Sequence, residues 1–146
     1  MIHLLHKRSK TPETTNAAVL VATMAATFAV LRVSLSISPD ADLNVCGYNI
    51  HHLFTGLVLA TVGGIPLALF GRDSRGRRVA LTLFGAGLAM ALDEWVYLIT
   101  TDGTNSSYLL PVSLWGGVVV VGFAAVYAIL LAVFAVWRLK RTGRHI

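Results

Sequence analysis

The sequence has few of the residues on which a water-soluble domain depends. Only 13% of its 146 residues are charged, and 7 of them are acidic, whereas ordinary globular chains carry roughly 25% charged residues. Its single cysteine, Cys46, excludes an internal disulfide framework. With 55% hydrophobic residues and a mean hydropathy of +0.70, the composition also excludes a disordered chain and a cytosolic enzyme with its own large core.

Four apolar stretches are each long enough to cross a hydrocarbon core, which takes ~20 helical residues. They are separated by polar segments rich in turn formers and cover residues 17–37, 50–70, 79–99 and 112–137. No stretch shows the alternation of a membrane barrel strand, so helices must satisfy the backbone. The sequence therefore predicts an all-α integral membrane protein: a four-helix transmembrane bundle in a single domain, residues 1–146.

The basic residues indicate how the bundle is oriented. A pI of about 9.9 would suggest nucleic acid in a soluble protein. Here, 11 of the 12 Lys and Arg lie before the first stretch, between the second and third, or after the fourth. The positive-inside rule then places both termini in the cytoplasm and the protein, multi-pass, in the plasma or cytoplasmic membrane. The expected partner is the lipid bilayer and not nucleic acid, and a homo-oligomer or a larger membrane complex is left open.

Five ionisable residues lie within or at the ends of these stretches, where they are costly. They are Arg32, the pair His51-His52 and the pair Asp93-Glu94. At 1.5 Å per residue, Arg32 and the two acids lie roughly 8–9 Å below the outer ends of their helices. Each buried charge costs ~2.5–3.5 kcal/mol on insertion scales. We therefore expect Arg32, at least one histidine and at least one acid to share one hydrogen-bonded or metal-bridged shell near the outer face.

The helical period indicates which way these side chains face. Successive residues diverge by about 100°, so at most one of the two histidines is expected to point inward. Glu94 shares a face with small residues and is expected at the bundle centre. Asp93 is expected beside it, hydrogen-bonded to Tyr97 or paired with Arg32.

Three polar side chains are expected to surround the cluster. Tyr48 precedes His52 by four residues, Thr55 follows His51 by four, and Tyr97 follows Asp93 by four. Residues four apart lie on the same side of a helix.

The residue types in the cluster suggest a metal site. Imidazole and carboxylate are ordinary ligands of zinc, manganese and iron, and three such ligands leave a position open for water or substrate. The expected ligands of a divalent metal are therefore His51, His52, Asp93 and Glu94, in a site that could be hydrolytic. Arg32 would bind an anionic group or act as a charge partner. No diagnostic motif such as H-E-x-x-H is present, so no catalytic residue is assigned.

Two other functions are compatible with the same residues. The chain could be a non-catalytic accessory or structural subunit of a membrane complex, in which the cluster locks helix packing. It could also be a subunit that binds a tetrapyrrole through a histidine. An ion conductor is disfavoured, because the inner half of each stretch lacks polar residues that would continue a path.

Overall fold

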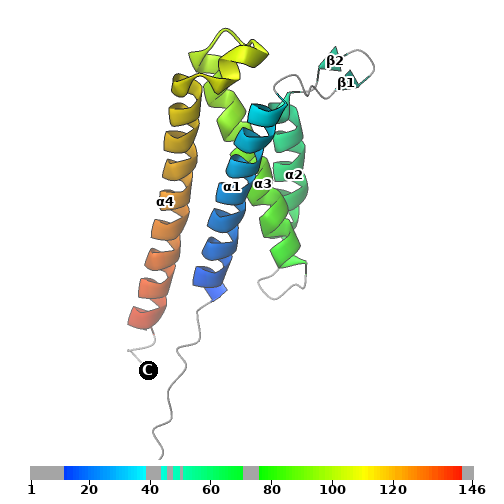
Figure 1. Ribbon diagram of the computed structural model, residues 1–146. Coiled ribbons are helices and arrows are strands. Elements are labelled where there is room, and N and C mark those ends of the chain that lie inside the picture. Colours follow the sequence, from blue (N-terminus) through cyan, green and yellow to red (C-terminus); the bar gives the residue numbers. More distant parts are fainter. Residues whose placement is uncertain (1–11, 39–43, 46–47, 50, 71–75, 143–146) are drawn as a thin grey trace, which may run out of the picture.

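The computed structural model describes residues 12–38, 44–45, 48–49, 51–70 and 76–142, and four long helices make up most of these residues (Figure 1). They are α1 (Pro12–Ile37), α2 (His52–Leu69), α3 (Arg77–Thr100) and α4 (Pro111–Thr142). A two-residue hairpin, β1 (Asn44–Val45) with β2 (Tyr48–Asn49), lies between α1 and α2, and a short 3₁₀ helix, η1 (Asn105–Leu109), precedes α4. All four helices are long and apolar enough to cross a membrane, which confirms this part of the prediction.

Helices α1 and α4 extend farthest beyond the predicted apolar stretches, for local chemical reasons. Helix α1 begins at Pro12, because a proline at the first helical position loses no hydrogen bond and Glu13 complements the positive end of the helix. Helix α4 continues to Thr142, where Lys140 and Arg141 complement the negative end. The guanidinium carbon of Arg141 lies 3.6 Å from the centroid of the Trp137 ring, so this basic side chain covers an apolar one.

Helix α3 is the centre of the arrangement. It packs against α2 on one side and against α1 and α4 on others, and α1 also packs on α4. Consecutive helices run in opposite directions, so the hairpin and η1 lie at one end of the molecule, and the start of α1 and the end of α4 lie at the other (Figure 1). Between α1, α3 and α4 the core consists of Met24, Ala89 and Val121.

Glycines bring the backbones of α2 and α3 into direct contact. A Cβ atom added to Gly56 would lie 2.7 Å from both the amide nitrogen of Ala91 and the carbonyl oxygen of Gly87. A Cβ atom added to Gly63 would lie even closer to backbone atoms of Ala80 and Phe84 in α3. Small residues permit this approach, which dispersion forces and weak hydrogen bonds stabilise in an apolar solvent. The two helices therefore hold the residues at their outer ends in a narrow range of positions.

Candidate functional site

The loop between α3 and α4 has an ordered turn that places η1 across the end of the bundle. Asp102 Oδ1 accepts hydrogen bonds from the backbone nitrogen of Thr104 at 3.1 Å and from its hydroxyl at 2.8 Å. These bonds from Thr104 hold the pKa of Asp102 below its usual range. Gly103 between them has φ +76°, a conformation that favours glycine. The turn leads into η1, from which Tyr108 enters the interior.

Four residues from four elements form a polar network, which we call the Arg32 network: Arg32 on α1, Asp93 on α3, Tyr108 on η1 and Ser113 on α4. Within the described residues, the buried Nε of Arg32 has no hydrogen-bond partner. Arg32 forms an ion pair with Asp93 Oδ1, and the Tyr108 hydroxyl donates to Asp93 Oδ2. The Arg32 guanidinium also donates to the carbonyl oxygens of Tyr108 and Ser113, at 2.9 and 3.0 Å, and to the Ser113 hydroxyl at 3.2 Å. Asp93 is 0% exposed, and both of its oxygens are engaged.

Aromatic rings cover the charge of Arg32. Its guanidinium carbon lies 4.2 Å from the centroid of Tyr108 and 5.4 Å from that of Phe28, distances at which the ring quadrupole attracts a cation. Tyr97 packs against Tyr108 with ring centroids 4.9 Å apart. Burial, and secondarily the negative charge of Asp93, raises the pKa of Tyr108 far above its usual value. The phenol therefore stays protonated and acts as a hydrogen-bond donor.

A glycine on α4 makes room for the network. A Cβ atom added to Gly117 would contact Asp93 Oδ1 and would lie 2.9 Å from the Phe28 ring and 3.0 Å from Arg32 Nη2. Any side chain here would displace Arg32 or push α4 away from α3. Gly117 therefore belongs to the site as much as the charged residues do.

The neighbouring acid, Glu94, forms a second group with both histidines, which we call the histidine group: His51, His52 and Glu94. Nδ1 of His51 lies 3.0 Å from Glu94 Oε1, and Nδ1 of His52 lies 3.6 Å from Oε2. The Glu94 side chain is 3% exposed, whereas those of His51 and His52 are 38% and 35% exposed. The group thus places a buried carboxylate beneath two imidazoles that reach the surface.

Both histidines contact Glu94 although they are neighbours in the sequence, and the start of α2 explains how. His52 is the first helical residue, but His51 is the N-cap and has an extended backbone, with φ −62° and ψ 150°. The 100° rotation between neighbours applies only when both residues are helical. The change of backbone conformation between the two residues lets both rings reach the same carboxylate.

The single shell expected from the sequence is divided in two. Asp93 pairs with Arg32, as one alternative proposed, whereas Glu94 faces α2 and the histidines. Within the described residues, no group of three His, Cys, Asp or Glu side chains is arranged to hold a metal ion.

The three surrounding side chains have different positions. Tyr97 reaches the Arg32 network through the ring of Tyr108, and it is Tyr108 that donates to Asp93. Thr55 is half-buried on α2, and the side chain of Tyr48 lies outside the described part of the structure.

Sequence reasoning missed Tyr108, Ser113 and Gly117. From its position in the sequence, Tyr108 resembles the aromatic residues that lie at membrane interfaces. Its contact with Asp93 depends on the conformation of the loop before α4, which the hydrophobic periodicity of the sequence does not reveal. One signal could have indicated such partners. A buried Arg-Asp pair still needs hydrogen-bond donors and acceptors for its remaining polar atoms, so further polar side chains were to be expected near it.

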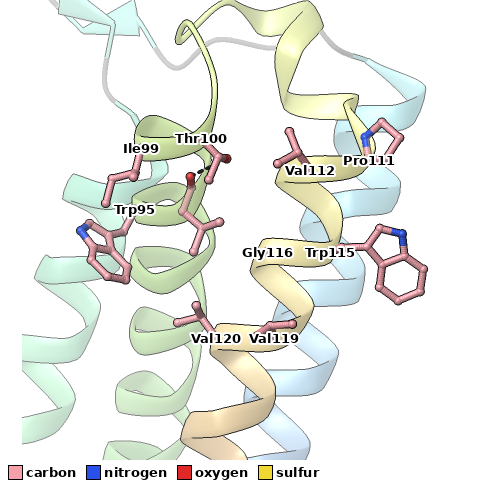
Figure 2. A pocket seen from close by; sticks show the side chains of 10 residues that line it. Trp95, Ile99, Thr100, Pro111, Val112, Trp115, Gly116, Val119 and Val120 are labelled. Atoms are coloured by element: carbon pink, nitrogen blue, oxygen red, sulfur yellow. Dashed lines mark hydrogen bonds between the residues drawn. The ribbon is translucent and has the colours of Figure 1, made fainter.

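Beside the Arg32 network, α3 and α4 border a lateral groove of about 570 Å³ (Figure 2). Its walls are apolar, and the hydroxyl of Thr100 is satisfied by the carbonyl of Val96 at 2.8 Å. Trp95 and Trp115 project to opposite sides of it (Figure 2). No titratable side chain that lines the groove belongs to the Arg32 network or to the histidine group.

Comparisons with known proteins add nothing to this geometry: no protein-family model, curated protein or solved structure matches the chain. Any assignment of function therefore depends on the contacts described above.

Proposed function

We propose that the chain is a multi-pass membrane protein with both termini in the cytoplasm and with the Arg32 network and the histidine group at the outer face. The support is the separation of charge along the helices. Apart from Arg32, the described Lys and Arg residues lie at the start of α3 and the end of α4, at the end of the molecule opposite the hairpin and η1 (Figure 1); they are Arg77, Arg78, Arg138, Lys140 and Arg141.

Cys46 provides the test of orientation, because it lies between α1 and α2 in the sequence. A membrane-impermeant maleimide should label it on intact cells. Labelling only after the cytoplasmic side is exposed would contradict the orientation.

We further propose that the histidine group binds a divalent transition metal such as zinc. The observation that supports this proposal is that two imidazole nitrogens lie against the two oxygens of one buried carboxylate. Metal–ligand distances of about 2.0–2.2 Å at a tetrahedral zinc separate two ligand atoms by roughly 3.3 Å. The observed N–O distances are 3.0 and 3.6 Å, to different oxygens of the carboxylate. The three side chains are not arranged to hold an ion as they stand, so a bound metal would require the imidazoles to rotate and would replace the hydrogen bond between His51 and Glu94.

Charge balance favours the same assignment. Within the described residues, Arg32 pairs with Asp93, and no Lys or Arg pairs with Glu94. A metal ion would supply the positive charge that stabilises this buried carboxylate. Asp93, one of the four ligands expected from the sequence, is left out of the proposed site because Arg32 and Tyr108 occupy both of its oxygens. Water or a small anion would complete the coordination at this half-exposed group.

Zinc titration of the full-length protein in detergent micelles tests the metal proposal. Because any accessible histidine is able to bind zinc, the experiment uses a background chain in which His3, His6 and His145 are replaced by alanine. Isothermal titration calorimetry should give one zinc per chain. The absence of a stoichiometric site in this background would refute the proposal.

Variants of the histidine group then locate the site. Glu94→Gln and His51→Ala should each weaken zinc binding at least tenfold, since even groups that only orient ligands contribute 10–100-fold. Glu13→Gln, which removes a carboxylate at the other end of the bundle, is the matched control and should bind as the background does. Equal binding by Glu94→Gln and Glu13→Gln would place the metal elsewhere.

A structural role is the second candidate, and the Arg32 network favours it. The network leaves neither Asp93 oxygen free to bind a ligand and connects α1, α3, η1 and α4. The histidine group connects α2 to α3, because His51 and His52 contact Glu94. If Glu94→Gln lowers the resistance to unfolding and no variant binds zinc, both groups serve to fix helix packing.

A further inference from the structure

A second groove lies at the opposite end of the molecule, between the last turns of α2 and the first turns of α3. It has a volume of about 540 Å³. Its walls are formed mainly by apolar side chains, among them Val62, Pro66 and Phe70 of α2 and Val79 and Leu83 of α3. Several of these are largely exposed, including Val62, Phe70 and Val79. The groove is therefore an open channel on the side of the helix pair.

One charged residue, Arg77, lines this apolar groove. Its Nε atom is buried and has no hydrogen-bond partner within the described part of the chain. A buried polar group without a partner is costly, so a movement of the Arg77 side chain that turns its guanidinium toward a hydrogen-bond acceptor in the groove would be stabilised. Arg78, the next residue, is exposed and does not line the groove. The combination of an apolar channel and a cation at its rim is complementary to an anionic amphiphile.

We propose that this groove binds one acyl chain of an anionic phospholipid, whose phosphate is held by Arg77. The dimensions agree with this occupant. From Val62 to Phe70 the groove follows α2 for roughly 12 Å at 1.5 Å per residue, and one leaflet of a ~30 Å hydrocarbon core is roughly 15 Å thick. Guanidinium groups bind phosphate oxygens through two parallel hydrogen bonds. The groove lies at the basic end of the bundle, so in the orientation proposed above the lipid would come from the cytoplasmic leaflet.

Lipid retention measured by native mass spectrometry tests this proposal on the full-length protein. The protein in detergent is mixed with phosphatidylglycerol or phosphatidylcholine of identical acyl chains. We expect one phosphatidylglycerol to be retained preferentially. Arg77→Gln should lower this retention about fivefold, the effect expected for one cation near an anionic lipid. Arg78→Gln removes the same charge one residue away and should change retention much less.

The acyl-chain part of the proposal needs its own variant. Val62→Trp places a large ring in the channel at an exposed position and should reduce retention of phosphatidylglycerol while leaving the helical circular dichroism signal unchanged. Equal losses in Arg77→Gln and Arg78→Gln would mean that general surface charge binds the lipid. Equal retention of the two lipids by the wild-type protein, or full retention by Val62→Trp, would also refute the site.

Discussion

Replacing Gly56 by alanine tests whether direct backbone contact between α2 and α3 holds the outer site together. The new methyl group would lie 2.7 Å from the Ala91 nitrogen and 2.7 Å from the Gly87 oxygen, and 2.9 Å from Met90 Cβ. Ordinary contacts between heavy atoms are about 3.5–4.0 Å. Because two of the three atoms belong to the backbone, no change of rotamer can relieve the overlap, and the helices must move apart by about 1 Å.

The expected cost follows from this separation. A gap of 0.5–1 Å forfeits about a quarter to a half of the dispersion energy of each contact affected, and overpacking typically costs about 1–3 kcal/mol. Alanine is favoured over glycine within a helix by up to about 1 kcal/mol, which acts in the opposite direction. We therefore expect Gly56→Ala to lower the free energy of unfolding by about 1–2 kcal/mol, or roughly tenfold in the unfolding equilibrium.

Reversible unfolding in mixed micelles with increasing sodium dodecyl sulfate, followed by circular dichroism, measures this difference. Gly122→Ala on α4 is the matched control, because a Cβ atom added at Gly122 has no heavy atom within 4 Å. The control should be neutral or slightly stabilised, since it receives only the helix-propensity gain.

A second measurement connects the packing to the site. Gly56 lies about one turn beyond His52 on α2, and its contact Ala91 precedes Glu94 on α3. A displacement of about 1 Å between the helices would change the 3.0 Å contact between His51 and Glu94. Zinc affinity should therefore fall in Gly56→Ala but not in Gly122→Ala. Equal stability and equal affinity of the two variants would refute the reasoning about close packing.

The number of membrane-compatible helices could be predicted from the sequence because apolar length alone determines it. The ends of the helices could not be read from the same signal. Pro12 and Thr142 extend α1 and α4 into polar sequence, where capping chemistry and charge, not hydrophobicity, decide the boundary. The predicted divergence of Asp93 and Glu94 agrees with the structure because both residues lie well inside α3.

The partners of those two acids were only partly predictable. Their positions along the helices predicted that Arg32 and Asp93 lie at a similar depth in the membrane, and in the structure they form an ion pair. The positions of His51 and Tyr108 depend on an N-cap and a 3₁₀ turn, both set by local backbone angles. Sequence periodicity carries no information on either.

Two further predictions concern the Arg32 network. The variants Arg32→Met and Asp93→Asn should each destabilise the protein by more than half of the loss in the double variant, because either single change leaves a buried partner uncompensated. We expect a double-mutant cycle to give a coupling of about 1–3 kcal/mol. Additive losses would contradict the pairing. Tyr108 should make stability depend on alkaline pH. Burial and the charge of Asp93 raise the pKa of Tyr108 in the folded protein, whereas in the unfolded chain the phenol ionises near pH 10. The contribution of the protonated phenol is therefore complete below about pH 10 and is lost as the pH rises above this value. The free energy of unfolding, measured from pH 8 to 11, should fall more steeply in the wild-type protein than in Tyr108→Phe, which lacks the hydroxyl that donates to Asp93. Parallel curves for the two proteins would mean that Tyr108 ionises as readily in the folded state as in the unfolded chain.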